Sequence, residues 1–226
     1  TALHNTLEHV FKFRTDHKKF PDPMLVKEFL ERELGKLPIT HNEFVRHHEH
    51  GFEVLLTYIA HIEKSLAVMT KEEFSIQVTL KTGDDDFPEI LLTGKLDRLD
   101  FDAEGKLQCV IDYKSGKPRT RGYIEGTTKD STGDYKRQLT FYALLLSLYG
   151  DERYDCKNGV LSFIEADEKG VIHEEAYTIT DDEITLLKGE IIRVAREIAQ
   201  GTFLHAPCDP EKSDYCHLAT EFQKRI

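Results

Sequence analysis

The stretch GKLDRLDFDAEGKLQCVIDYKSG at residues 94–116 decides the fold of this chain, because it predicts two adjacent β-strands joined by a turn. Each half has the apolar content and the flanking glycine of a strand, and DAEG at residues 102–105 is typical of a tight turn. In such a hairpin Asp97 and Asp112 lie side by side. Two facing carboxylates repel each other unless a cation lies between them, and a hard divalent metal is the usual cation.

Lys114 lies two positions after Asp112, so a strand directs both side chains to the same face of the sheet. Together with Asp97 they bring two carboxylates and one amine to one point. An isolated Asp-x-Lys pattern more often describes solvated residues on the polar face of an antiparallel sheet. The metal-site interpretation therefore needs support from elsewhere in the chain.

Four motifs, ALHNTLE, GKLDRLD, IDYKSG and QLTFYALLL, provide that support. They resemble, in order, the motifs of the PD-(D/E)XK nuclease superfamily, specifically its RecB-like, helicase-associated branch. The residues they contribute are, in chain order, His4, Asp97, Asp112, Lys114, Gln138 and Tyr142. Four ordered motifs are far more specific than one Asp-x-Lys pattern.

The resemblance implies a divalent-metal site with Mg²⁺ or Mn²⁺ as the cofactor. Its ligands would be His4, Asp97, Asp112 and the backbone carbonyl of Tyr113, a set of donors that suits either ion. Phosphodiester hydrolysis needs a metal that polarises the phosphate and activates water, and positive charge near the developing negative charge. Lys114 would position the attacking water or stabilise the transition state.

The segment at residues 132–149 has the apolar content of a largely buried helix. Gln138 and Tyr142 lie four positions apart, so they share one face of that helix. The resemblance places them against the DNA strand or just behind the metal site. Without it, Tyr142 would be an ordinary core residue and Gln138 a surface polar residue.

The composition indicates a globular protein, since 39% of the 226 residues are hydrophobic and no low-complexity run occurs. A formal charge of −11 argues against a protein that coats nucleic acid nonspecifically. No long apolar stretch and no amino-terminal signal pattern occur, so neither a membrane span nor secretion is predicted. Four cysteines without close pairing fit a reducing compartment, and a cytoplasmic location is predicted.

A local basic surface is nevertheless predicted between Lys114 and the helix of Gln138, where basic residues outnumber acidic ones. The segment is rich in Gly, Thr and Ser, which favours a mobile loop that orders on a DNA backbone. A solvated surface without a partner is the alternative. The predicted DNA-binding residues are Lys117, Arg119, Arg121, Lys136 and Arg137.

The whole chain, residues 1–226, is predicted to be one α/β (α+β) domain with a mixed central sheet flanked by helices. A helical insertion is expected at about residues 20–70, a catalytic core at 74–200 and a tail at 201–226. Besides the helix at 132–149, helices are expected at 3–15, 25–37, 43–69 and 181–200. Strands are expected at 74–81, 90–101, 106–114, 159–166 and 171–178.

Five histidines form a second cluster, and a solvated helix surface is the favoured interpretation for them. They are His41, His47, His48, His50 and His61. His47 and His50 share a helical face, but no carboxylate or cysteine completes a recognisable metal-binding set.

The carboxyl-terminal segment resembles the region where relatives carry three of the four cysteines of an iron–sulfur cluster. The expected positions fall on Ser213, Cys216 and Phe222, so no iron–sulfur cluster is predicted. The tail is expected to serve in packing. A zinc site is the alternative, and it would use Cys208, Cys216, His205 and His217.

The chain begins at Thr1 inside the first motif, which predicts a domain excised from a larger protein. The resemblance implies a helicase motor in the same chain or complex, and no GxxxxGK[ST] motor motif occurs in these residues. We expect a metal-dependent deoxyribonuclease acting on single-stranded DNA or DNA ends in recombination or repair. The alternatives are a catalytically inactive DNA-binding module of the same fold and a stand-alone exonuclease similar to CRISPR-associated relatives.

Overall fold

The computed structural model of the protein describes residues 2–64, 69–202 and 216, and its centre is a five-stranded sheet in the order β1-β2-β3-β4-β5. β3 and β4 are parallel, and all other neighbours are antiparallel. The strands are β1 (Met69–Lys81), β2 (Glu89–Phe101), β3 (Leu107–Lys114), β4 (Asn158–Phe163) and β5 (Glu174–Thr178). The predicted α/β class with a mixed sheet is confirmed.

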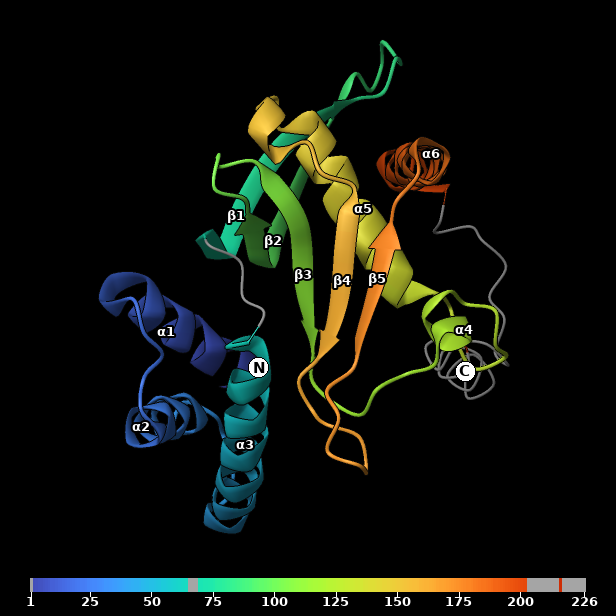
Figure 1. The fold of residues 1–226 in the computed structure, drawn as a ribbon. Helices are drawn as coiled ribbons and strands as arrows, with labels where there is room; N and C mark the ends of the chain where they lie inside the picture. Colours follow the sequence, from blue (N-terminus) through green and yellow to red (C-terminus); the bar gives the residue numbers. More distant parts are fainter. Residues whose placement is uncertain (1, 65–68, 203–215, 217–226) are drawn as a thin grey trace, which may run out of the picture.

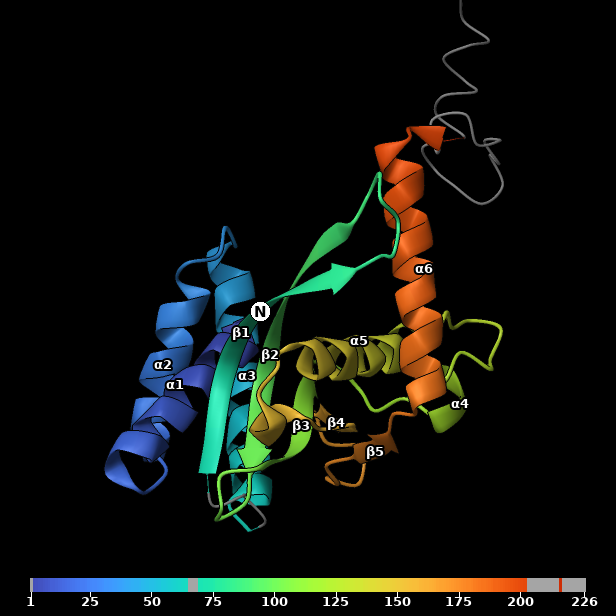
Figure 2. The same ribbon diagram turned by 90° about the horizontal axis from the view of Figure 1, so that it is seen from above.

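Helices cover both faces of this sheet (Figure 1). They are α1 (Ala2–His17), α2 (Pro23–Leu34), α3 (His41–Ile62), α4 (Arg121–Ile124), α5 (Asp134–Leu148) and α6 (Asp181–Ala199), with a 3-10 turn, η1 (Glu152–Tyr154). The view from above in Figure 2 shows α1, α2 and α3 on one side of the sheet and α5 and α6 on the other. Two hydrophobic cores result, one on each face.

Capping residues explain where three of the helices begin. Thr40 and Thr180 each form a reciprocal capping box with a glutamate three positions later, at the starts of α3 and α6. Asp22 caps α2, whose first residue is a proline. The start of α6 therefore falls where the sequence predicts it.

The α1–α2 contact is held by one buried carboxylate. The Glu33 side chain is 1% exposed and accepts hydrogen bonds from Asn5 and Lys36, with His9 Nε2 at 2.9 Å from its Oε1. Although burial opposes it, these bonds lower the pKa of Glu33 from 4.5 to about 2. The three amino-terminal helices thus pack as one unit, and the predicted helical insertion shares its core with α1.

Several predicted boundaries are wrong. α3 ends at Ile62 instead of reaching residue 69, and β1 begins at Met69 because its pairing with β2 continues to Met69↔Phe101. β4 and β5 are shorter than predicted, since a turn lies between them. In that turn the Asp167 carboxylate accepts the backbone N–H groups of Lys169 and Val171.

Two glycines of the sheet allow α5 to pack unusually close. A Cβ atom at Gly94 would lie 2.4 Å from Leu145 Cδ1, and one at Gly159 would lie 2.9 Å from Leu139 Cδ2. Side chains at these positions would push the helix outward. Gly94, the glycine of GKLDRLD, therefore sets how closely α5 can pack on the sheet.

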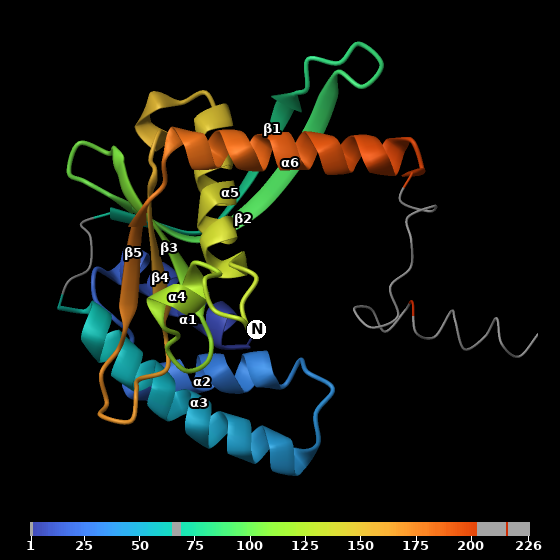
Figure 3. The ribbon, with the colours of Figure 1, turned by 90° about the vertical axis from the view of Figure 1, so that its right-hand side faces the viewer.

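α6 extends beyond the main sheet toward the β1–β2 hairpin, as Figure 3 shows. Arg196, near its end, forms an ion pair with Asp84 in the hairpin loop, at 2.9 Å. Among the described helices, none is both long and apolar enough to cross a membrane.

In both β1 and β2 the regular alternation of side chains between the two faces of the sheet is interrupted, and the two interruptions lie at the same level. In β2, Leu96 and Leu99 belong to the core under α5, whereas Arg98 between them contacts Phe11 of α1. In β1, Lys71 and Phe74 contact that same α5-side core, and Glu73 between them has φ +50°. Each strand therefore has one residue outside the regular alternation, and we call these two residues together the matched bulge, although the register between the strands does not shift.

The extra residues stand opposite each other, because Glu72 pairs with Arg98 and Phe74 pairs with Leu96. They are Glu73 and Asp97. Since both strands gain one residue, the register of the pair is unchanged on either side. Asp97 is also one of the predicted metal ligands.

Candidate active site

Asp112 and Lys114 form a buried ion pair at the end of β3. The Asp112 side chain is 1% exposed, and Lys114 Nζ lies 2.6 Å from its Oδ2. Lys114 also donates a hydrogen bond of 2.6 Å to Gln138 Oε1 and lies 4.7 Å from the centre of the Tyr135 ring. The strand periodicity predicted this shared face.

α5 contributes the other half of a closed network. Gln138 Nε2 donates to the Tyr142 hydroxyl at 2.6 Å, and that hydroxyl donates to Asp112 Oδ1 at 3.1 Å. A ring of contacts therefore runs through Lys114, Gln138, Tyr142 and Asp112. The four residues, predicted from two separate motifs, lie together.

Burial raises the pKa of Asp112, and the Lys114 ammonium opposes this effect. Burial and the Asp112 charge together raise the pKa of Tyr142 far above its ordinary value. The Tyr142 hydroxyl therefore remains a hydrogen-bond donor at any physiological pH.

Asp97 lies beside this network but binds the backbone. Its Oδ2 accepts the N–H of Tyr113 at 2.8 Å, and regular pairing of β2 with β3 begins only at Arg98↔Ile111. Burial raises the pKa of Asp97, and the Tyr113 N–H opposes this effect. The charge of Asp97 raises the pKa of Asp112, so the two carboxylates lie near each other, as the hairpin predicted.

His4 approaches from α1, whose first turn lies near the end of β3 in Figure 1. Its ring centroid is 6.1 Å from that of Tyr113. Burial lowers the pKa of His4, and the nearby carboxylates of Asp112 and Glu73 oppose this effect. The histidine of the first motif therefore faces the same pocket as the carboxylates.

A buried arginine, which the sequence analysis missed, holds Tyr113 from behind. Arg98 is 4% exposed, pairs with both oxygens of Asp100 at 2.7 and 3.0 Å, and donates to the Tyr113 hydroxyl at 3.3 Å. Its guanidinium lies beside the stacked Phe11 and Tyr113 rings, at 5.3 and 5.8 Å from their centroids. This arrangement fixes the strand whose N–H binds Asp97.

Glu73 is a second residue that the sequence analysis missed. It stands opposite Asp97 in the bulge and forms an ion pair with Lys95. A glutamate at φ +50° is strained, so the surrounding strands must hold it there. The only signal in the sequence is the spacing of three between Leu96 and Leu99, where a regular strand has two.

The predicted basic loop does not form one continuous surface. Arg121 pairs with Glu125 and Glu175, Lys136 pairs with Glu183, and Arg137 pairs with Asp134. Part of the segment is helical, since Thr120 caps the short helix α4. Lys117 and Arg119 are both exposed, and both lie next to the end of β3.

The model of the PD-(D/E)XK nuclease superfamily matches residues 1–220 of this sequence. The chain belongs to the PD-(D/E)XK nuclease superfamily. A mixed sheet flanked by helices is consistent with that fold.

Solved structures similar to this PD-(D/E)XK chain include the crystal structure of SSO0001. That comparison has 15% identity and a TM-score of 0.40, and it covers 97% of this chain and 81% of the other. A candidate exonuclease from Eubacterium rectale has 10% identity and a TM-score of 0.41, with 81% of this chain and 71% of the other covered. No curated protein matches the chain.

PD-(D/E)XK nucleases use divalent metal ions, and the donors of the pocket fit such an ion in kind. Asp112 Oδ2 is buried and makes no hydrogen bond of good geometry, and oxygen ligands with one imidazole suit Mg²⁺ or Mn²⁺. Across the described ranges, however, no three His, Cys, Asp or Glu side chains stand together as a ready metal site. The Lys114 ammonium lies 2.6 Å from Asp112 Oδ2, the carboxylate oxygen that Tyr142 does not hold.

The remaining sequence predictions meet the structure in part. Of the histidine cluster, His47 and His50 are exposed, but His48 stacks between Phe44 and Phe52 with its Nε2 3.2 Å from Glu31, so it is not simply solvated. The predictions for the tail beyond residue 202, including the absence of an iron–sulfur cluster and the zinc alternative, lie outside the described residues except for Cys216.

Proposed function

We propose that this chain is a metal-dependent deoxyribonuclease domain that cuts single-stranded DNA or DNA ends. The observation that carries the proposal is the buried network of Asp112, Lys114, Gln138 and Tyr142 beside Asp97. A purely structural sheet has no need for a buried carboxylate, a second, half-buried carboxylate and a lysine at one point. The network therefore favours catalysis over an inactive module of the same fold.

Asp97, Asp112, His4 and the carbonyl of Tyr113 would hold the metal ion. When bound, a divalent ion supplies a polarised phosphate and a water of lowered pKa. Lys114 supplies positive charge where the phosphate becomes more negative, and it is held in place by Gln138. Tyr142 holds one oxygen of Asp112, which leaves the other oxygen for a cation.

The DNA backbone would reach this pocket over Lys117 and Arg119, which are exposed next to the end of β3. We further propose that a helicase motor in the same chain or complex supplies the strand during recombination or repair. The cell compartment would be the cytoplasm. In this arrangement the domain needs no sequence-specific contacts, because the motor brings the DNA to it.

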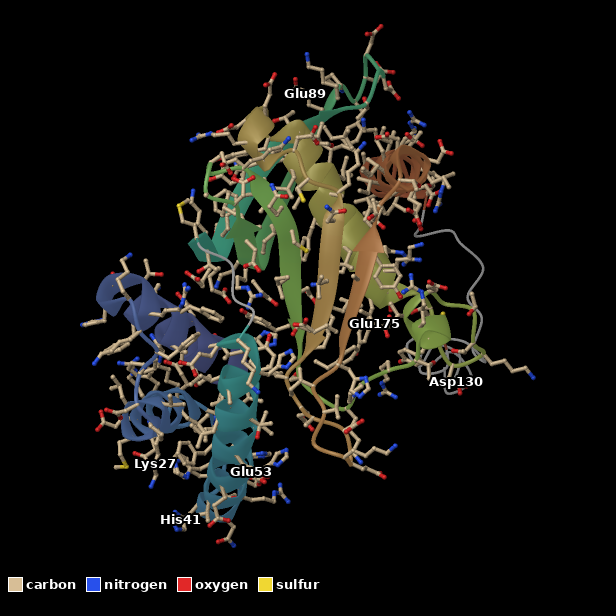
Figure 4. The ribbon with its side chains drawn as sticks, viewed as in Figure 1. Lys27, His41, Glu53, Glu89, Asp130 and Glu175 are labelled. Atoms are coloured by element: carbon tan, nitrogen blue, oxygen red, sulfur yellow. The ribbon has the colours of Figure 1, made fainter. Side chains whose placement is uncertain are left out.

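The test is cleavage of end-labelled single-stranded DNA, duplex DNA and RNA of one sequence by the purified domain with Mg²⁺, Mn²⁺ or EDTA. We expect metal-dependent cutting of single-stranded DNA that is abolished in Asp112→Asn and in Lys114→Met. Lys27→Met is the matched control. Lys27 forms an exposed pair with Glu31 at 4.0 Å on α2 and is labelled in Figure 4.

Three outcomes would count against the proposal. Cleavage that persists in EDTA would exclude a metal requirement. Cleavage that persists in Asp112→Asn would exclude the assigned active site. DNA binding without cutting under every metal condition would favour the inactive module. Circular dichroism of each variant separates loss of chemistry from loss of fold.

A further inference from the structure

An apolar hollow of about 370 Å³ opens directly beside the candidate active site. We call it the aliphatic hollow, and its walls include Leu3, Leu30, Leu34, Leu37, Ile39 and Ser115. Leu3 precedes His4 in the chain and Ser115 follows Lys114. The hollow is therefore attached at two points to residues of the candidate site.

The aliphatic hollow has the composition of a binding site for a flat, mostly apolar group. Its walls come from α1, α2, α3 and the loop between α2 and α3, and the imidazoles of His47 and His50 stand at its edge. Leu37 is 44% exposed, so the hollow is open to solvent. Pockets for small molecules have volumes of about 300–1,000 Å³, and this one lies near the lower limit.

A second, larger hollow of about 700 Å³ adjoins the first, and His50 and Glu165 line both. We call it the charged hollow, because Lys117, Arg119 and Lys169 line it together with the four carboxylates of Glu165, Asp167, Glu168 and Glu175. Glu175, labelled in Figure 4 on β5, marks another part of its wall. The two hollows together form one path from the end of β3 outward.

Two of the four carboxylates of the charged hollow have close partners. Asp167 pairs with His173 at 2.9 Å, and Glu175 pairs with Arg121 at 3.3 Å. Within the described part of the chain, Lys117 forms neither an ion pair nor a hydrogen bond, and Arg119 contacts only the ring of Tyr123. These two cations remain available for phosphates.

We infer that the aliphatic hollow takes one unstacked base of a single-stranded DNA whose neighbouring phosphate lies at Asp112 and Lys114. This inference rests on the proposed nuclease function and names the form of its substrate. The phosphates that follow lie on Lys117 and Arg119 in the charged hollow. A base reaches such a hollow only when it is unpaired, so the hollow selects single strands over duplex.

The experiment measures cleavage of single-stranded oligodeoxynucleotides in which one abasic residue is moved stepwise past the cut position. We expect kcat/KM of the wild type to fall about tenfold when the abasic residue occupies one particular position next to the cut bond, as loss of one base contact predicts. Leu37→Trp fills the aliphatic hollow. It should cut the intact strand about tenfold more slowly and no longer distinguish it from the abasic strand.

Met24→Trp is the matched control, because Met24 is 66% exposed on α2 and does not line the hollow. It should retain the wild-type preference for the intact strand. An abasic residue without effect at every position would overturn the inference, as would an equal loss of rate on intact and abasic strands in Leu37→Trp.

Binding separates this inference from the proposed function. Fluorescence anisotropy of the same oligonucleotides in EDTA reports the aliphatic hollow even if the domain cuts nothing. Weaker binding of the abasic strand to the wild type, but not to Leu37→Trp, supports the hollow independently of catalysis. Equal affinities for the intact and abasic strands in both proteins would exclude base binding in the aliphatic hollow, whatever the result of the cleavage assay.

Discussion

Replacing Lys114 by methionine should convert Asp112 into an uncompensated buried charge. The Lys114 ammonium lies 2.6 Å from Asp112 Oδ2, and the carboxylate is 1% exposed. Removing one partner of a buried pair typically destabilises a protein by about 3–5 kcal/mol. Protonating at pH 7 a carboxyl whose ordinary pKa is 3.8 costs about 4 kcal/mol, which limits the loss. We therefore expect the free energy of unfolding to fall by ~3–4 kcal/mol.

The size of this loss should depend on pH and on metal. Without Lys114, burial raises the pKa of Asp112 further, so the deficit is present at neutral pH and disappears as the pH falls below about 4, where the carboxyl is protonated in both folded and unfolded states. A divalent ion bound to Asp112 would compensate the same carboxylate charge. A metal at one hundred times its Kd would restore about 2.7 kcal/mol.

The assay is urea unfolding of wild type and Lys114→Met in EDTA and in Mn²⁺, from pH 4 to pH 8. Lys27→Met is the control, and its exposed ion pair is worth at most about 1 kcal/mol. The double variant Asp112→Asn with Lys114→Met should regain most of the stability, because the buried charge is gone. A loss below about 1 kcal/mol in EDTA, or a Lys114→Met protein whose free energy of unfolding Mn²⁺ does not raise, would refute the assignment of Asp112 as both partner of Lys114 and metal ligand.

Three further substitutions and one control, Gly189→Ala, test the frame around the site, each by chemical denaturation. Gly94→Ala should destabilise the protein by about 1–3 kcal/mol through contact with α5, whereas Gly189→Ala, in open space on α6, should stabilise it by about 0.5–1 kcal/mol. Glu33→Gln should cost ~2–3 kcal/mol at pH 7, and the difference from wild type should shrink as the pH falls from 4.5 toward 2, because the lowered pKa of Glu33 stabilises the fold only above that range. Arg98→Leu should cost about 3–5 kcal/mol, since it leaves the carboxylate of its partner buried and unpaired. Losses under about 1 kcal/mol would contradict the packing or pairing described for each residue.

The elements with strong local signals were predictable from the sequence. The turn at residues 102–105 joins β2 and β3 as expected, with Gly105 at φ +79° and Asp102 accepting backbone N–H groups. Gln138 and Tyr142 are in contact because residues four apart share a helical face. Local spacing was enough in both cases.

Features that depend on contacts between distant segments were not predictable. The direction of the Asp97 carboxylate toward the Tyr113 N–H depends on how β2 and β3 diverge, which no local pattern encodes. The basic residues of the predicted loop differ in a way that the sequence does not show, because Lys136 and Arg121 find acidic partners on α6 and β5. The number of charged residues can be read from the sequence, but the ion pairs that they form with distant segments cannot.

The matched bulge at Glu73 and Asp97 has a consequence for how such a site is gained or lost. Deleting one of the two residues would shift the register of β1 against β2 and turn part of one strand inside out. Deleting both would leave a regular two-stranded ribbon with every apolar side chain on its proper face and no carboxylate at the pocket. The lengths of the two strands are therefore coupled at this point, because a change in one strand keeps the register only if the other strand changes with it.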